Sequence, residues 1–164
     1  MYYNNKMKVN TVGKKLSEVV CAYLAGFLDG DGAIMACIEK HQEKKFGFRV
    51  RVFVKITQRD RINLEWIFAE TGLGSIMTRK SYCEWLIRDQ SQVRNFLDSI
   101  LPYLRCKKKQ ALIAAKILSQ KILSKDDLIN TSQLADSLSV LNVRSKNRRR
   151  NFSTMIKDSF SRND

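Results

Sequence analysis

Residues 48–57 alternate strictly between two kinds of side chain, and this pattern constrains the fold more than any other feature of the sequence. Every second position is apolar, and the positions between them are mostly basic or polar. The apolar positions are Phe48, Val50, Val52, Val54 and Ile56. A period of two is typical of a β-strand with one face in the core and the other in solvent. The sequence therefore predicts a long, half-buried strand.

Helical and strand-like segments fill the rest of the chain. Ser17 can cap an almost wholly apolar helix from about Glu18 to Leu28, and Asp60 is the expected cap of a second helix that ends at Gly72. Pro102 separates the later helices. The expected helices are near 18–28, 61–71, 91–101, 107–123 and 128–141, and the expected strands are near 33–38, 48–57, 75–79 and 84–88. This order predicts an α+β fold of the type αββαββα with extra C-terminal helices.

The charge balance indicates the kind of partner. The 164 residues include 30 Lys and Arg against 16 Asp and Glu, so the formal net charge is +14. Such an excess favours nucleic acid, because each phosphate contact releases condensed counterions. The longest apolar run, Val19–Leu28, is half the ~20 residues that a membrane-spanning helix needs, so no membrane partner is expected. The first fifteen residues lack the apolar core of a secretory signal, and the four scattered cysteines with one histidine offer no zinc site.

An acidic, glycine-rich stretch, Asp29-Gly30-Asp31-Gly32, follows directly on the apolar helix. The C-terminal end of a helix carries partial negative charge, so carboxylates there are better tolerated beside a divalent cation. A solvated acidic turn explains the same four residues, and composition alone leaves both interpretations open. Ala22, Gly26 and Gly30 recur every four residues, which would let a second helix cross at close distance.

The segment Leu24–Gly32, LAGFLDGDG, resembles the nine-residue signature of the LAGLIDADG homing endonucleases in six of its nine letters. The resemblance implies the αββαββα fold of that family, in which a four-stranded antiparallel sheet forms a saddle over double-stranded DNA. It also implies metal-dependent phosphodiester hydrolysis that leaves short 3′ overhangs. Asp31 would bind the catalytic Mg²⁺, with Gly30 beside it, and Mn²⁺ or Ca²⁺ can occupy such sites in vitro. Asp29 would support the turn.

Two further local matches add catalytic residues by resemblance. The segment Ile56–Asp60 looks like the end of the family's long second strand, where a glutamine positions the active-site water, which assigns that role to Gln58. The segment Pro102–Gln110 looks like the start of the family's late helix, where a lysine approaches the scissile phosphate. Lys107 is the first choice for that lysine, and Lys109 is the second. A lysine run at a helix start also fits an ordinary solvated surface.

The chain departs from the family at one position. Relatives that form homodimers usually have a basic residue four positions after the glutamine, where this chain has Ile62. Arg61 is the catalytic residue assigned in its place, and Arg59 is the alternative.

The chain contains one copy of the signature. All 7 Gly residues lie at or before Gly74, so the rest of the chain cannot contain a second copy. Single-motif members of the family, of the type that group I introns encode, act as homodimers. The resemblance therefore implies two signature helices at a twofold axis, a long pseudo-palindromic target, and an interface that includes Ala22, Gly26 and Phe27.

Basic residues on the predicted hairpins and near the C-terminus are the candidates for DNA contact. No acid lies between Arg49 and Arg59, which indicates an electropositive sheet face suited to the major groove. The candidates on the hairpins are Arg49, Arg51, Lys55, Arg79, Lys80 and Arg88. We expect an endonuclease domain over residues 1–142, with a basic lead-in over about 1–16, and a basic tail over 143–164 that stays mobile until it meets phosphate. The tail candidates are Arg144, Lys146, Arg148, Arg149 and Arg150.

Other functions use the same features. The fold could serve an intron RNA maturase, for which intron RNA would be a partner, or a DNA-binding regulator that does not cleave. A structural, RNA-associated basic protein would show weak, sequence-independent binding. A restriction-type site that combines Asp31 with Glu43 and Lys45 is disfavoured because the last two lie in a polar loop. An organelle, either chloroplast or mitochondrion, or a prokaryotic cytoplasm is the expected location.

Overall fold

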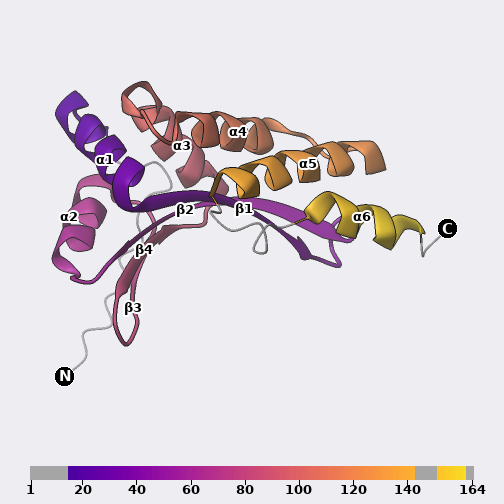
Figure 1. Cartoon of the computed structure of the whole chain (residues 1–164), viewed down its shortest axis with the longest axis horizontal. Helices are drawn as coiled ribbons and strands as arrows, with labels where there is room; N and C mark the ends of the chain where they lie inside the picture. The colour runs from indigo at the N-terminus through magenta and orange to yellow at the C-terminus, as the bar shows by residue number, and fades with distance from the viewer. Residues whose placement is uncertain (1–14, 143–150, 162–164) are drawn as a thin grey trace.

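The computed structural model describes residues 15–142 and 151–161, which form a curved sheet with helices packed on its convex side (Figure 1). The elements in chain order are α1 (Glu18–Asp31), β1 (Gly32–Lys40), β2 (Phe48–Gln58), α2 (Ile62–Thr71), β3 (Ser75–Thr78), β4 (Cys83–Ile87), α3 (Gln90–Ile100), a 3-10 turn (Leu101–Tyr103), α4 (Lys108–Ser119), α5 (Lys125–Asn142) and α6 (Phe152–Ser161). The strand order is β1-β2-β4-β3, and each neighbouring pair is antiparallel. The predicted αββαββα order with extra C-terminal helices is confirmed.

Strand β2 lies at the centre of the sheet and has the predicted alternation. Its apolar side chains face the helices, and Val52, Val54 and Ile56 are wholly buried. The basic side chains of the same strand point to the opposite, concave side. On the helical side, Trp85 of β4 donates from Nε1 to the carbonyl oxygen of Leu73 over 2.9 Å and packs edge-on against Phe96. The core therefore fills the space between the sheet and the helical layer.

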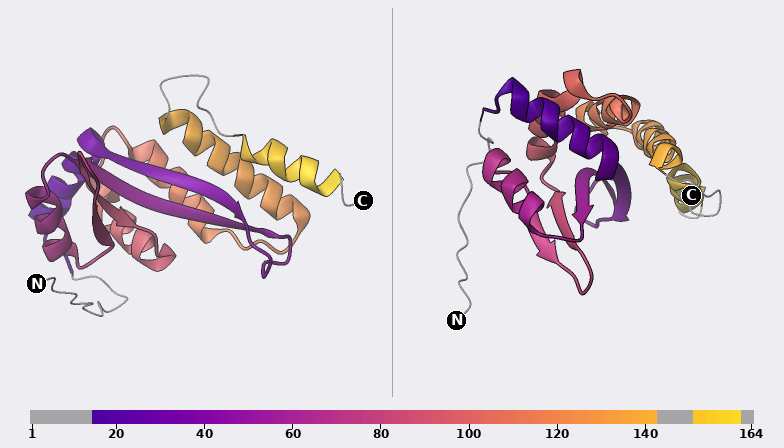
Figure 2. Two further views of the ribbon diagram at one scale, coloured as in Figure 1. Left: turned by 90° about the horizontal axis from the view of Figure 1, so that it is seen from below. Right: turned by 60° about the vertical axis from the view of Figure 1, so that its left-hand side comes forward.

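The two hairpins diverge part of the way along β2 (Figure 2, left). Strand β1 pairs with β2 along its whole length, whereas β4 pairs only with Val54–Gln58. Where β4 stops, the side chain of Gln90 replaces it. The Val52 N–H donates to Oε1 of Gln90 over 2.9 Å, and Nε2 of Gln90 donates to the Val52 carbonyl over 2.8 Å. One side-chain amide thus satisfies the backbone groups that a strand would otherwise pair.

Helix α1 extends three residues beyond its predicted end at Leu28, so Asp29, Gly30 and Asp31 lie in its last turn. Ser17 caps its start as predicted, accepting from the Val20 N–H. Two carboxylates in the last turn of a helix are unfavourable by themselves, because the C-terminal end of a helix carries partial negative charge. The carboxylate of Asp29 overcomes this repulsion by accepting backbone donors from another segment, as described below.

Two other helix ends differ from the sequence prediction. Asp60 does not cap α2, because Arg61 occupies the cap position and makes no side-chain cap hydrogen bond. Gly72 ends α2 as predicted, with a left-handed φ of 64°. Asp89 caps α3 by accepting from the Gln92 N–H over 2.9 Å, so this helix begins at Gln90.

Part of the predicted C-terminal tail is a packed helix. Helix α6 lies against α5 and buries Phe152 and Ile156. Asp136 of α5 accepts the backbone N–H groups of Phe152 and Ser153 and so caps the first turn of α6. The expectation of a mobile tail is therefore wrong for residues 152–161, because an apolar face and a cap hold them on the domain. The predicted tail contacts Arg144, Lys146, Arg148, Arg149 and Arg150 lie outside the described residues.

No helix in the described part of the chain is both long and apolar enough to cross a membrane. The four cysteines are free thiols.

Candidate functional site

Asp31 and Gln58 meet where two elements end. Asp31 is the last residue of α1, and Gln58 is the last residue of β2. The β1–β2 register, in which Gly32 faces Ile56, brings these two ends together. The side chain of Gln58 donates from Nε2 to Oδ2 of Asp31 over 2.8 Å. The structure therefore brings two of the predicted catalytic residues into direct contact on an exposed edge of the molecule.

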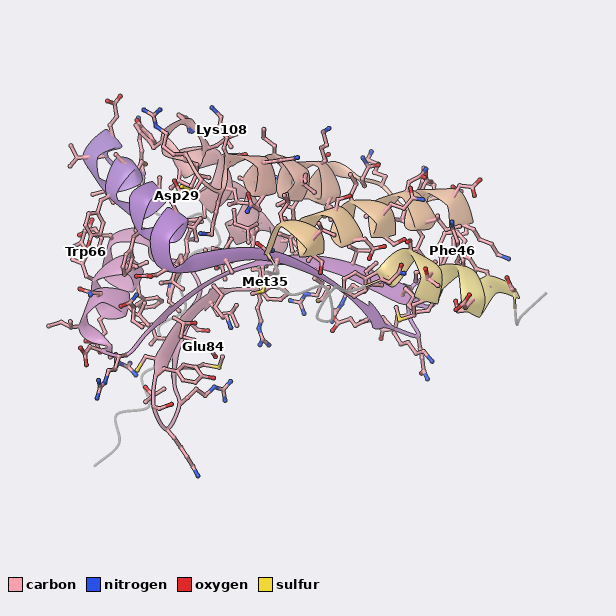
Figure 3. All side chains as sticks on the ribbon, viewed as in Figure 1. Asp29, Met35, Phe46, Trp66, Glu84 and Lys108 are labelled. Atoms are coloured by element: carbon pink, nitrogen blue, oxygen red, sulfur yellow. The ribbon has the colours of Figure 1, made fainter. Side chains whose placement is uncertain are left out.

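The side chain of Asp29 makes no hydrogen bond with Gln58; it binds the segment that precedes α4 and so joins that segment to α1. Its Oδ2 accepts the N–H groups of Arg105 over 2.7 Å and Cys106 over 3.1 Å, and its Oδ1 accepts that of Lys107 over 2.8 Å. In return, Nζ of Lys107 donates to the backbone oxygen of Asp29. Figure 3 labels Asp29 on α1 and Lys108 at the start of α4. The two acids of the motif thus have separate roles, because one fixes the scaffold and the other faces solvent.

The electrostatics of Asp29 fit this structural role. Burial acts to raise the pKa of Asp29, but the net pKa lies below its usual value. The backbone donors of Arg105, Lys107 and Cys106 and the positive charge of Lys107 stabilise the ionised form more than burial disfavours it. Asp29 is therefore a carboxylate at neutral pH.

The loop held by Asp29 places Lys107 at the last turn of α1. Its ammonium group donates a hydrogen bond to the carbonyl oxygen of Asp29, two residues before Asp31, where the end of the helix carries partial negative charge. Lys109, the second choice for the catalytic lysine, is exposed on α4. Of the two lysines, Lys107 is the one that the structure holds next to the residues of the motif.

Arg61 is held at a different place. Its Nε donates to Oε1 of Glu65 over 2.7 Å, and its Nη1 donates to the Thr78 hydroxyl over 3.0 Å, so the guanidinium links α2 to β3. Ile62, which stands where homodimeric relatives usually have a basic residue, is 72% exposed. The structure thus joins Arg61 to β3 and shows no hydrogen bond between it and the Asp31–Gln58 pair among the described residues.

The oxygen atoms around Asp31 suit a hard divalent cation. One carboxylate oxygen accepts from Gln58, and the Gly30 carbonyl belongs to the last helical turn, where oxygens lack intrahelical donors. Carboxylate and carbonyl oxygens are the ligands that Mg²⁺ and Ca²⁺ prefer. In the described part of the chain, no three or more His, Cys, Asp and Glu side chains gather as a possible metal site. Among the described residues, the carboxylate of Asp31 and the carbonyl of Gly30 are the oxygen donors of the motif that could hold such a cation.

The outward face of α1 is unusually open. Ala22, Gly26 and Gly30 are all exposed on it, and a side chain added at either glycine would meet no other atom within 4 Å. Beside this strip of small residues lies an aromatic group, in which Tyr23 packs edge-on against Trp66 of α2 at 4.9 Å between ring centroids. Phe27, the third predicted interface residue, lies 6.0 Å from Tyr23 by the same measure and is half-buried.

The concave face of the sheet carries charges of both signs. Along β2 the prediction of a face without acids holds, but the neighbouring strands bring Glu39 and Glu84 onto it. Glu39 of β1 faces Arg49 directly in the register and pairs with it, and it lies 3.8 Å from Arg51. The face predicted to be electropositive therefore also includes acids of the neighbouring strands, because cross-strand partners are set by the register and not by sequence proximity.

The remaining basic candidates also lie at this face. Oε1 of Glu84 accepts from Nζ of Lys55 over 3.0 Å, and its Oε2 accepts from Nε of Arg79 over 3.5 Å. Arg51 donates from Nη2 to the carbonyl oxygen of Arg88 over 3.1 Å. Lys80 is exposed in the turn between β3 and β4. The six predicted basic residues outnumber the two carboxylates, so the face keeps a positive balance.

Sequence reasoning missed Glu39, Glu84, Tyr23 and Trp66. Tyr23, Trp66 and Glu84 belong to segments that were correctly predicted, whereas Glu39 lies in β1 one residue beyond the predicted strand 33–38. No local pattern identified the partners of these four residues. Alternation in β4 would have placed Glu84 on the outer face, and only the strand order β1-β2-β4-β3 brings it beside Lys55.

Comparison with known proteins agrees with this geometry. A model of the LAGLIDADG endonuclease family matches residues 24–117. The DNA endonuclease I-CreI of Chlamydomonas reinhardtii is 32% identical over 133 residues, which are 78% of this chain and 82% of that protein. The DNA endonuclease I-CvuI of Chlorella vulgaris is 31% identical over 126 residues, which are 73% of this chain and 78% of that protein.

Solved structures agree as well. The structure of I-CvuI with the I-CreI target in the presence of magnesium has a TM-score of 0.80 at 25% identity and covers 88% of this chain and 94% of that one. I-CvuI has also been solved with its own target in the presence of calcium. The archaeal intron-encoded endonuclease I-Vdi141I, complexed with DNA, has a TM-score of 0.74 at 22% identity and covers 88% of this chain and 98% of that one, which supports the fold. The motif, the fold and the matching family model together show that this chain belongs to the LAGLIDADG endonuclease family.

Proposed function

We propose that two copies of this chain form a site-specific DNA endonuclease that cuts both strands of a long, nearly palindromic target and leaves short 3′ overhangs. The observation that carries the proposal is the position of Asp31. It is exposed at the end of α1, held by Gln58, on a helix whose outward face is open at Gly26 and Gly30. Family membership makes DNA the substrate, and the relatives I-CreI and I-CvuI are DNA endonucleases.

The proposal requires a second copy. The described part of one chain offers Asp31 and no metal-binding group of three or more side chains. The small residues on the outward face of α1 allow two such helices to cross at close backbone distance, and a twofold axis at the crossing would bring both Asp31 side chains together. The exposed Tyr23 and Trp66 extend the apolar part of that face.

The concave face is the surface for DNA. The sheet is curved (Figure 1). Its concave face carries more basic than acidic side chains, and Gln58, which contacts Asp31, is the last residue of its central strand β2. A two-stranded β-ribbon fits the major groove, where arginine can pair with the O6 and N7 atoms of guanine. Two such faces related by a twofold axis would read a target with twofold symmetry.

In this proposal Asp31 and the Gly30 carbonyl would hold Mg²⁺, which when bound would supply charge stabilisation and an activated water for phosphodiester hydrolysis. Gln58 orients the free oxygen of Asp31 and offers its amide to ordered water. Lys107 lies at the same helix end and would neutralise charge that develops on the phosphate. Intron RNA remains a proposed further partner, on the strength of the family resemblance alone.

The proposal is tested with Asp31→Asn and the matched control Asp98→Asn, which changes an exposed acid on α3. Asparagine keeps the size and the acceptor oxygen that Gln58 uses, so the fold should not change. Each protein is incubated with a library of near-palindromic duplexes in Mg²⁺, and the cut ends are sequenced. We expect wild type and Asp98→Asn to cut one symmetric site, and Asp31→Asn to bind that site with cleavage reduced by about 10³-fold or more.

Other outcomes would redirect the assignment. Full Mg²⁺-dependent cleavage by Asp31→Asn would refute the metal role of Asp31. Sequence-selective retention of duplexes without cutting by any of the three proteins would indicate a regulator. Failure to retain duplexes, together with binding to intron RNA, would indicate a maturase.

A further inference from the structure

Glu84 differs from the other carboxylates on the concave face because it is enclosed. It is 7% exposed and is the only acidic residue among the described ones that is buried. It lies in β4 opposite Thr57 of β2 and Met77 of β3, and the next residue, Trp85, points into the core. Figure 3 shows Glu84 beneath the sheet, on the side away from the helices.

An ionised carboxylate at this place carries a cost. Its hydrogen bond with Lys55 is the main reason why the pKa of Glu84 lies below its usual value, so the group is charged at neutral pH. A buried charge is stable only when it is paired and hydrogen-bonded. A negative charge facing DNA also repels phosphate. The presence of an acid here calls for a role that a neutral side chain would not fill.

The two partners of Glu84 come from different strands. Lys55 belongs to β2, and Arg79 immediately follows β3. Each carboxylate oxygen takes one of them, at 3.0 Å from Nζ of Lys55 and 3.5 Å from Nε of Arg79. Because Glu84 sits between the two, it fixes the separation of two cations that would otherwise repel each other.

The atom through which Arg79 is held decides what the rest of its side chain can do. Glu84 contacts Nε, and the two terminal Nη groups have no hydrogen-bond partner among the described residues. These two groups form the fork that pairs with O6 and N7 of guanine. In the Arg49–Glu39 pair, by contrast, Oε1 of Glu39 accepts from both Nε and Nη2 of Arg49, so that fork is already partly occupied.

We propose that Glu84 is a specificity-determining positioning residue: it holds Arg79 through Nε so that the terminal fork faces one guanine in each half of the DNA target. Lys55, held by the other carboxylate oxygen, lies beside it and keeps two further N–H groups for the neighbouring base or phosphate. The inference rests on the proposed function. It adds to that function the base that is recognised, guanine, and the residue, Glu84, that orients the arginine recognising it.

The test compares wild type, Arg79→Lys, Glu84→Gln and the double variant on a library in which each half-site position is randomised. Binding without metal and cleavage with Mg²⁺ are both scored by sequencing, and Asp98→Asn serves as the control. We expect wild type to prefer guanine at one position per half-site by about tenfold to a hundredfold. Arg79→Lys should lose most of this preference, because an ammonium lacks the planar fork.

Glu84→Gln should reduce the preference at the same position to about threefold or less, because Arg79 is no longer fixed. It should also bind unrelated duplexes more tightly than wild type, since a negative charge has left the face. The guanine preference of the double variant should be no lower than that of either single variant, since both substitutions disrupt the same Arg79–Glu84 interaction. A residue that served only stability would lower the melting temperature without changing the base preference.

Glu84→Asp provides a second route should glutamine disturb the sheet. It keeps the charge but shortens the side chain by one methylene, so we expect loss of the guanine preference without tighter binding to unrelated DNA. An unchanged base profile in both Glu84 variants, or a loss spread evenly over all positions, would overturn the inference and leave the endonuclease proposal intact. Absence of any base preference in the wild-type protein would overturn both.

Discussion

Replacing Asp29 by alanine removes the contact that joins the end of α1 to the start of α4. Three backbone N–H groups, those of Arg105, Cys106 and Lys107, lose a charged acceptor. A hydrogen bond to a charged group contributes about 1.5–3 kcal/mol, but three bonds to one carboxylate are not additive and water can reach the exposed part of the loop. We therefore expect the free energy of unfolding to fall by about 2–4 kcal/mol.

The same contact predicts how this loss depends on pH. The pKa of Asp29 lies below its ordinary value in the folded protein. Its contribution is therefore fully present above the unfolded pKa of about 3.9 and disappears as the pH falls through the lower, folded pKa. The stability difference between wild type and Asp29→Ala should be constant from about pH 6 to 8 and should shrink below about pH 4.

Urea unfolding followed by circular dichroism measures both quantities, and Asp98→Ala is the control for removing an exposed acid. A loss below about 0.5 kcal/mol, the range of ordinary surface substitutions, would refute the assigned hydrogen bonds. A stability difference that stays the same down to pH 3 would refute the charged state of Asp29.

Two further predictions concern the proposed catalytic lysine and the proposed dimer. Lys107→Met removes the ammonium group but keeps most of the aliphatic stem. Single-turnover cleavage should therefore fall by about 10²–10³-fold while the affinity for the target changes little. An equal loss of binding and cleavage would contradict a role in the chemistry. Gly26→Leu places a side chain where the single chain has open space, so the fold should persist while the close helix crossing is blocked. Sedimentation should then give 19.0 kDa for this variant and about twice that for wild type, and a dimeric, active Gly26→Leu protein would rule out the crossing at α1.

The sequence predicted elements whose signal is local. The alternation at Phe48–Ile56 gave the strand and its buried face, since a period of two has one structural meaning over such a length. The LAGLIDADG-like motif identified Asp31, and the strand end at Gln58 supplied its partner, because both lie within segments that resemble the family.

The parts that local signals did not predict depend on contacts distant in sequence. The extension of α1 to Asp31 depends on a loop beginning at Arg105, 76 residues after Asp29. The acids on the concave face come from strands that pair with β2 only after folding. Helix α6 was missed because its apolar positions, Phe152 and Ile156, lie within a region whose overall charge indicated a solvated tail.

The amide of Gln90 has a consequence for how the target of this family member can change. Its side chain takes the place of β4 beside Val52, so β4 pairs with β2 only from Val54 onward. The outer part of the β1–β2 hairpin therefore does not pack against the β3–β4 hairpin. Substitutions at Arg49 therefore need no repacking around Arg79, and effects at such separated sites usually add. We therefore expect the β1–β2 and β3–β4 hairpins to recognise bases independently. Substitutions on the outer part of β1–β2 could then change the outer bases of each half-site while recognition of the inner bases stays unchanged.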